Sequence, residues 1–148
     1  DLNNVNVRSI ASTLGLTVEE KRSSEPVTFN EWLHVQAFHN GEKVVSAGST
    51  FFGSPDNPRI VRVFSQPTEI VPFGVVLLLS NKDRPGMVGY LGTLLARHKV
   101  NIASMSLSRD TAGGQALTVL NLDSVPPPEV LDEIQKDPDI SNVKVVEL

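Results

Sequence analysis

The sequence predicts an α+β protein built in two parts, and three observations indicate it. Apolar residues in the first half mostly alternate with polar ones, which is typical of antiparallel strands. The second half interleaves apolar, strand-like runs with two segments of helical spacing. A turn-forming stretch, Val-Pro-Phe-Gly at residues 71–74, separates the two. We therefore expect one unit over residues 1–73 and another over residues 74–148.

Composition excludes several classes of function. The 148 residues carry a formal net charge of −4, and the basic residues are scattered, which argues against nucleic-acid or anionic-membrane partners. The absence of cysteine excludes disulfides, thiolate metal sites and a thiol nucleophile. No apolar run approaches the roughly 20 residues that span a bilayer, and the polar N-terminus does not resemble a signal peptide. We expect a cytoplasmic protein.

The first half should contain one helix followed by antiparallel strands. Apolar residues at helical spacing indicate the helix: Val7, Ile10, Ala11 and Leu14. Gly15 then provides a left-handed residue that ends it. Residues 17–20 are expected to form a short strand. From Trp32 the period changes to two, which predicts a strand with one buried face, and Asn40-Gly41 predicts a two-residue hairpin turn.

The rest of the first half is divided by turn residues. Residues 44–52 should form the returning strand, residues 53–58 a loop and residues 59–64 another strand. Turn-forming residues at Gln66-Pro67 and at 71–74 interrupt the segment after residue 64, to which we assign no strand.

The second half has the order strand, helix, strand, strand, helix, strand. Strands are expected at residues 75–80, 102–108, 116–122 and 140–147. The first helix ends in the basic residues 97–99. Its apolar stripe consists of Met87, Val88, Leu91, Leu94 and Leu95. The second helix follows three prolines, ends at Asp137-Pro138 and presents Val130, Leu131 and Ile134. This order predicts a ferredoxin-like sheet of four antiparallel strands with both helices on one face.

The turn between the first strand and first helix of this unit, residues 81–89, is the strongest candidate for a binding site. Pro85 has the φ of a first helical turn, and Asp83 is a capping candidate. Gly86 and Gly89 allow a ligand or another backbone to approach, although with Gly92 they also have the spacing of packing glycines. Unpaired N–H groups at a helix start favour a carboxylate or phosphate. The alternative is a helix cap without a ligand.

Catalytic constellations are absent from the sequence. No dinucleotide-binding fingerprint follows a strand, and the three histidines, at positions 34, 39 and 98, lack metal-ligand spacing. Three serines on one predicted strand, at positions 104, 106 and 108, have no nucleophile elbow and no nearby His–Asp pair. We expect no catalytic, cofactor-binding or metal-binding residue in this chain.

A binding module is the remaining possibility. A two-fold partner could bring Asn81 and Asp83 close to Asn101 of the neighbouring chain. The Asp83 carboxylate could then bind an ammonium group, helix N–H groups a carboxylate, and an Asn amide a hydroxyl, which together suit an amino-acid zwitterion. The alternative for Asn101 is a residue that only ends a helix.

Residues 81–89, together with Val-Asn-Ile-Ala-Ser-Met at 100–105, resemble the ACT domain at the C-terminus of the D-3-phosphoglycerate dehydrogenase family. Residues 1–73 are similar to the intervening, allosteric substrate-binding (ASB) domain of the longer enzymes of that family, of which they would form a part. The resemblance implies a regulatory region of an NAD-dependent enzyme of serine biosynthesis. It implies that ACT domains pair by sheet extension into a homo-oligomer and bind L-serine for feedback control.

The resemblance also implies site residues. The serine ligands correspond to Asn81 and Asp83 of one chain and Asn101 of the other, and Arg59 corresponds to a possible anion-binding residue. Lys99 departs from the family, which often has glycine there, so a left-handed Lys99 would cost roughly 1 kcal/mol. Two alternatives are the regulatory portion of an iron–sulfur L-serine dehydratase and a purely structural dimerisation module.

Overall fold

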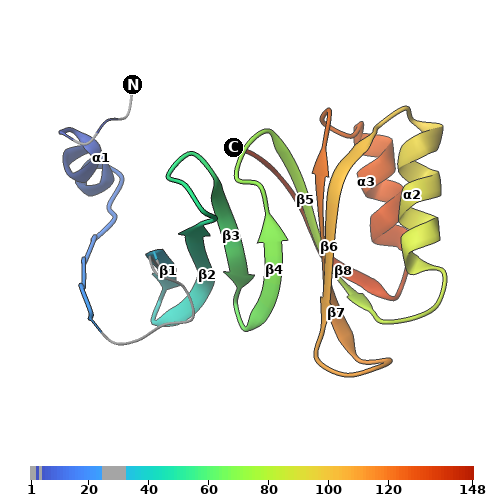
Figure 1. Ribbon diagram of the computed structural model, residues 1–148, viewed down its shortest axis with the longest axis horizontal. Helices are drawn as coiled ribbons and strands as arrows, with labels where there is room; N and C mark the ends of the chain where they lie inside the picture. Colours follow the sequence, from blue (N-terminus) through green and yellow to red (C-terminus); the bar gives the residue numbers. More distant parts are fainter. Residues whose placement is uncertain (1–2, 4, 25–32) are drawn as a thin grey trace.

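A computed structural model describes residues 3, 5–24 and 33–148. These residues form two four-stranded antiparallel sheets and three helices (Figure 1). The first sheet has the order β1-β2-β3-β4. Its strands have these bounds: β1 Leu33–His39, β2 Glu42–Phe51, β3 Pro58–Val63 and β4 Gln66–Ile70. The predicted α+β class is confirmed.

The second sheet has the predicted ferredoxin-like topology. Its order is β6-β7-β5-β8, with neighbouring strands antiparallel. The strands are β5 Val75–Lys82, β6 Ile102–Arg109, β7 Gln115–Leu122 and β8 Ile140–Glu147. Helices α2 (Met87–Arg97) and α3 (Pro128–Lys136) cover the face turned away from the first sheet (Figure 1). β6 is therefore an edge strand.

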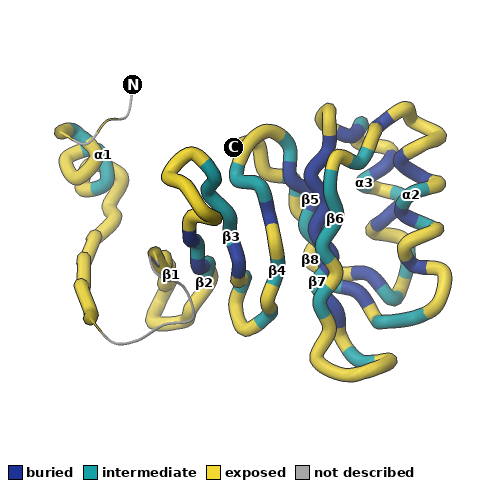
Figure 2. The backbone as a smooth tube through the Cα atoms, in the orientation of Figure 1, coloured by how far each residue is buried: buried dark blue, intermediate teal, exposed yellow. Residues whose placement is uncertain are grey.

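The main hydrophobic core lies between this sheet and its two helices. Leu77 and Leu79 of β5 are fully buried against Leu94 and Leu95 of α2 and Ile134 of α3. Burying a leucine or isoleucine side chain contributes about 1.5–3 kcal/mol, so this layer supplies most of the stability of the second half. Figure 2 shows the buried backbone concentrated here, whereas the first half is mostly exposed.

A second, smaller core joins the two sheets. Ile70 of β4 is buried against Val76 of β5 and Val119 of β7, on the face of the second sheet opposite the helices. Ile60 and Val63 of β3 pack beside them. The first sheet therefore covers part of the face of β5 that the helices leave open.

The first half departs from the predictions in three places. Residues 17–20 form no strand, and every residue of β1 is exposed, so its predicted buried face is wrong within the described structure. Trp32 lies outside the described residues. β4 was missed because Gln66-Pro67 was interpreted as a break. A proline lacks only the N–H, and β4 is an edge strand that tolerates its loss.

Helix α1 (Val7–Thr13) ends as predicted at Gly15, whose φ is +73°. It lies apart from both sheets in Figure 1, and none of its residues is buried. The hairpin turn at Asn40-Gly41 is confirmed, with φ of +50° and +82°. Among the described helices, none is both long and apolar enough to cross a membrane.

The start of α2 differs from the prediction. Gly86 has φ +89° and ψ −12°, the third position of a type II turn, and the Met87 N–H donates to the Arg84 carbonyl. Pro85 and Gly86 thus form a turn before the helix rather than its first turn. Among the described residues Gly89 and Gly92 are not packing glycines, because no atom beyond their chain neighbours and the backbone of their own helix lies within 4 Å of where their β-carbons would be. Val88, predicted in the apolar stripe, is 51% exposed.

The end of α2 is a Schellman motif. The Val100 N–H donates to the Leu95 carbonyl and the Lys99 N–H to the Ala96 carbonyl, both at 3.0 Å. Lys99 occupies the left-handed position of the motif, with φ +58°. Glycine is strongly preferred there because it has no β-carbon. The left-handed conformation considered for Lys99 is confirmed.

We expect Lys99→Gly to raise the free energy of unfolding by about 1 kcal/mol, because it relieves this strain while the two hydrogen bonds persist. Urea denaturation measures the change. Lys99→Ala is the matched control, since it removes the charged side chain but keeps the β-carbon. An equal gain from both variants would contradict the strain argument.

Candidate ligand-binding site

Asn81 lies near the end of β5 with its side chain buried. It is 1% exposed; its Oδ1 accepts from the Thr118 hydroxyl at 2.8 Å, and its Nδ2 donates to the Lys82 carbonyl at 3.0 Å. Both ends of the amide are therefore occupied by the protein. Asn81 fixes the β5 end against β7, and the described geometry leaves it little freedom to contact a ligand directly.

Asp83, the second predicted residue, is not a helix cap. Its Oδ2 accepts from the Arg109 guanidinium at 2.6 Å and from the Gly113 N–H at 3.0 Å. The hydrogen bonds from the Gly113 N–H and from the Arg109 guanidinium lower the pKa of Asp83 below the ordinary value of 3.8. The carboxylate is thus ionised at neutral pH. Its other oxygen, Oδ1, has no hydrogen-bond partner among the described residues.

The first turn of α2 lies next to this carboxylate along the chain. The N–H groups of Val88 and Gly89 have no acceptor within the described structure, while the next N–H, of Tyr90, donates to the Gly86 carbonyl. Unpaired N–H groups at a helix start carry partial positive charge. The turn thus combines a carboxylate oxygen, two donors and the Arg109 cation.

Arg84, between Asp83 and the helix, holds the turn against the other side of the domain. Its Nη2 lies 2.6 Å from Asp137 Oδ2 and its Nε 2.7 Å from Asp139 Oδ2. Both aspartates lie in the α3–β8 connection, so the pairs tie the turn before α2 to that connection. Arg84 therefore has a structural role at the site.

Asn101 lies at the other end of the sheet. It precedes β6, whose Ile102 pairs with Leu122, and Leu122 pairs with Val75 at the start of β5. With a rise of about 3.3 Å per residue, the length of β5 separates Asn101 from Asp83 by on the order of 20 Å. Asn101 is exposed, and its Nδ2 donates to Asp123 at 2.8 Å. One chain does not bring the predicted residues together.

Arg59 lies on β3, far along the chain from these residues. Its Nε is 3.4 Å from Glu69 Oε1, its guanidinium lies 5.9 Å from the centre of the Phe52 ring, and its side chain is 20% exposed. An anion at Arg59 would have to compete with Glu69. Among the described residues, no three His, Asp or Glu side chains gather in a way that could hold a metal ion.

Sequence reasoning missed Arg109 and Thr118 as neighbours of the site. Both follow from strand register: Arg109 pairs with Ala116, which pairs with Asn81, and Thr118 pairs with Leu79. Arg109 is the last residue of β6, one residue beyond the strand predicted at residues 102–108. The register between β5, β7 and β6, which local sequence patterns do not fix, brings Arg109 to Asp83.

Two of the three serines of β6 bond to the first sheet, and the third, Ser104, bonds to Asn121 of β7, which itself holds Val71. The Ser106 hydroxyl is 3.1 Å from Thr68 Oγ1 and accepts from the Glu69 N–H, both on β4. Ser104 donates to Asn121 Oδ1, and Ser108 donates to Gln66 Oε1. These serines, which showed no catalytic pattern in the sequence, thus contribute to a line of polar contacts between the two sheets.

Comparison with known proteins identifies related sequences. Residues 75–139 match the ACT domain family. The chain is 34% identical to D-3-phosphoglycerate dehydrogenase of Archaeoglobus fulgidus over 150 residues. It is 31% identical to enzymes of the same name from Methanocaldococcus jannaschii, over 147 residues, and Mycobacterium tuberculosis, over 144 residues.

The matches cover 97–100% of this chain but only 27–28% of each relative. The chain therefore spans little more than a quarter of the length of these relatives, and it corresponds to their C-terminal regulatory region.

Proposed function

Residues 75–139 form an ACT domain, and on that premise we propose that the chain is the regulatory region of a D-3-phosphoglycerate dehydrogenase that binds L-serine where two ACT domains meet. NAD binding and catalysis would belong to other domains of a longer, cytoplasmic polypeptide in the serine pathway. The division into an ASB-type unit, residues 1–73, and an ACT unit, residues 74–148, is part of this proposal.

One observation carries the proposal: the unpaired edge strand β6 has Asn101 just before its start and the Arg109–Asp83 pair at its end. Antiparallel pairing of two β6 strands about a two-fold axis sets the start of each strand beside the end of the other. Asn101 of one chain would then approach Asp83 of its partner. Pairing would extend the sheet to eight strands and remove an exposed edge.

The chemistry available there suits an amino acid. Asp83 Oδ1 would accept from the ammonium group, and its lowered pKa keeps it charged at neutral pH. The N–H groups of Val88 and Gly89 would donate to the carboxylate. The partner's Asn101 amide would both donate to and accept from the serine hydroxyl. Asn81 would act indirectly, by holding the end of β5 in place.

Calorimetric titration of the 148-residue chain with L-serine tests the proposal. We expect binding at no more than millimolar concentration, and Asp83→Asn should weaken it by about 10–100-fold, since it removes the charge that pairs with the ammonium group. Asp83→Asn keeps an oxygen that can accept from Gly113, so the β6–β7 loop should stay in place.

Asp56→Asn, in the exposed loop between β2 and β3, is the control and should leave the affinity unchanged. The chain must be shown to be dimeric by light scattering before titration. A dimer that does not bind L-serine at millimolar concentration would exclude serine as the ligand. Equal affinities of the parent chain and Asp83→Asn would remove Asp83 from the site.

A further inference from the structure

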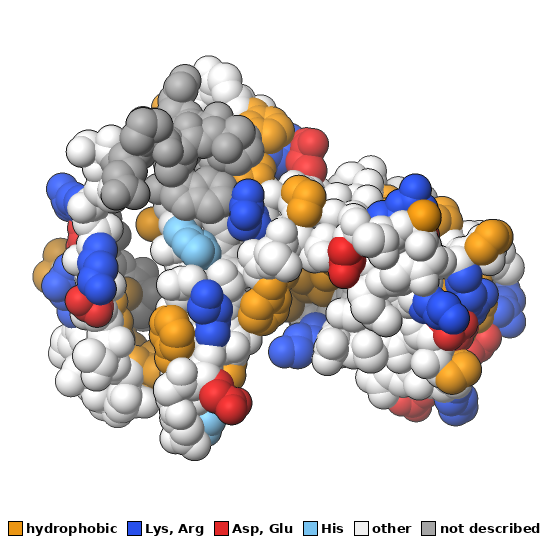
Figure 3. Space-filling view, turned by 90° about the horizontal axis from the view of Figure 1, so that it is seen from below, with side chains coloured by type: hydrophobic (Ala, Val, Ile, Leu, Met, Phe, Trp, Pro, Cys, Tyr) orange, Lys and Arg blue, Asp and Glu red, His pale blue; other side chains and the backbone are white. Residues whose placement is uncertain are grey.

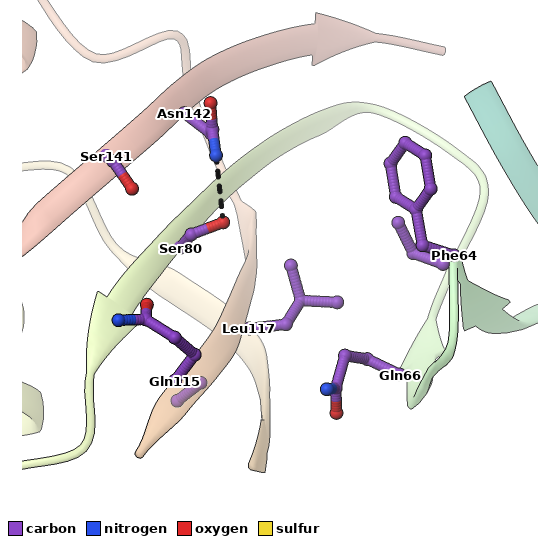
Figure 4. A pocket seen from close by; sticks show the side chains of 9 residues that line it. Phe64, Gln66, Ser80, Gln115, Leu117, Ser141 and Asn142 are labelled. Atoms are coloured by element: carbon purple, nitrogen blue, oxygen red, sulfur yellow. Dashed lines mark hydrogen bonds between the residues drawn. The ribbon is translucent and has the colours of Figure 1, made fainter. Parts of the chain in front are cut away.

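A cleft of about 330 Å³ opens between the two sheets, on the side of the second sheet opposite the helices. Figure 4 shows Ser80, Ser141 and Asn142 of β5 and β8 along one side, Phe64 and Gln66 of the β3–β4 hairpin along the other, and Leu117 between them. Its volume is at the lower end of the range for small-molecule sites. It opens on the face of the second sheet opposite α2, the helix to whose first turn we assign L-serine.

The lining of this cleft carries no formal charge. The nine lining residues are four apolar and five neutral polar ones: Val63, Phe64, Ala116, Leu117, Gln66, Ser80, Gln115, Ser141 and Asn142. A charged ligand would lose hydration without gaining an opposite charge, which is unfavourable. A zwitterion such as L-serine is therefore a poor occupant, and an uncharged molecule is favoured.

Hydrogen-bonding capacity is left over on the polar side. Asn142 Nδ2 donates to Ser80 Oγ at 3.4 Å, a long bond, and Asn142 Oδ1 has no further partner among the described residues. The Ser141 hydroxyl and the Gln115 amide likewise have no recorded side-chain partner there. An amide or hydroxyl of a ligand could donate to and accept from this group.

Phe64, on the opposite side of the cleft, has an unusual backbone conformation. It has φ +50°, a conformation that a bulky residue rarely adopts, and its N–H donates to the Ser46 carbonyl at 2.7 Å. Asn142, across the cleft, has φ +52°. These are two of only four non-glycine residues with positive φ in the described structure. Strained residues cluster at ligand-binding sites.

Phe64 is 51% exposed. Figure 3 shows hydrophobic side chains exposed near the middle of the molecule. A hairpin turn normally places Asn or Gly at a left-handed position, so stability alone favours a different residue. An exposed ring held there at the expense of strain is suited to stacking on a flat ligand.

We propose that the cleft between the sheets binds a small uncharged molecule that has a flat ring, stacked on Phe64, and an amide or hydroxyl group directed at Ser80, Ser141 and Asn142. Because such a ligand contacts both sheets, its binding favours the arrangement in which they are packed together.

Benzamide is a suitable probe, and benzoate is its charged counterpart of the same size. Titration of the ¹⁵N-labelled chain, followed by NMR, should show benzamide shifting the backbone resonances of residues 64, 80, 141 and 142 with a Kd on the order of millimolar. Benzoate should bind about tenfold more weakly. Saturating L-serine should not displace benzamide, which separates this site from the proposed serine site.

Phe64→Asn tests two effects of Phe64 separately: the backbone strain at this position and the stacking of its ring on the ligand. It should raise the midpoint of thermal unfolding by roughly 2–4 °C, since asparagine tolerates a positive φ, and weaken benzamide binding by about fivefold. Asn40→Gly is the control, because it also replaces a residue with positive φ, in the β1–β2 turn outside the cleft, and should leave binding unchanged.

A second variant, Asn142→Gly, removes the amide at the other left-handed position and should also weaken binding. Shifts confined to other surfaces, no binding at all, equal binding of benzoate, or unchanged affinity of Phe64→Asn would each overturn the proposal.

Discussion

A heterodimer of the Asp83→Ala and Asn101→Ala variants should bind one L-serine with the affinity of the parent chain, whereas either variant alone should bind none at the same concentration. The proposed site takes Asp83 from one chain and Asn101 from the other, so each homodimer of a variant has both sites damaged. In the heterodimer both substitutions fall in one site, and the second site keeps its two residues.

The experiment uses two affinity tags. Co-expression with a different tag on each variant and purification through both tags isolates the heterodimer, and calorimetry gives the stoichiometry, expected at about half that of the parent dimer. A heterodimer carrying both substitutions on one chain is the matched control, since each of its sites loses one residue and it should bind nothing. Restored binding in this control, or none in the test heterodimer, would exclude a shared site.

The stoichiometry matters because one chain holds the predicted residues on the order of 20 Å apart, at opposite ends of β5. From the sequence we expected only that a two-fold partner could bring these residues together. The sequence could not predict that Asp83 pairs with Arg109 or that the Asn81 amide is buried against Thr118. Those contacts depend on the register between β5, β7 and β6.

The second half was predicted closely because each of its elements carries its own signal. Leu77 and Leu79 lie in a continuous apolar run, and Leu91, Leu94 and Leu95 have helical spacing, so local pattern and tertiary burial agree. The first half lacks this agreement. β1 alternates Leu33 and Val35 with polar residues, yet both are exposed in the described structure. A pattern shows which residues could be buried and does not show what covers them.

Two errors came from residues that are ambiguous in sequence. Pro67 was interpreted as a break, although an edge strand accommodates it. Pro85-Gly86 was interpreted as the first turn of α2, although the pair forms a type II turn ahead of it. Both dipeptides are compatible with either structure locally. Tertiary contacts, which a short stretch of sequence does not contain, decide which of the two structures forms.

Asn121 holds the junction between the two sheets. It lies on β7 and is 7% exposed. Its Nδ2 donates to the Val71 carbonyl at 2.8 Å, and its Oδ1 accepts from the Val71 N–H and from the Ser104 hydroxyl. One side chain thus satisfies both backbone groups of the residue that follows β4. The contacts fix the position of β4 across β6, the strand through which we propose that two chains pair.

Asn121→Ala should lower the free energy of unfolding by about 2–4 kcal/mol, because it leaves the Val71 N–H and carbonyl without partners at a half-buried position. Hydrogen exchange under native conditions should show the amides of β4 losing protection first, while those of β5 and α2 keep theirs. Ser104→Ala, which removes only the hydroxyl contact to Asn121, should lower the free energy by about 1 kcal/mol.

Comparing the two variants shows whether Asn121 specifically attaches the first sheet to the second or contributes only to general packing. If the backbone contacts to Val71 matter, Asn121→Ala loosens β4 and Ser104→Ala does not. If the two variants destabilise equally, or if protection falls equally in both sheets, then Asn121 contributes only to the general stability of β7. Selective loss in β4 would show that the first sheet depends on Asn121 for its attachment, so that an event at β6, such as dimer formation or serine binding, has a direct physical connection to residues 58–71.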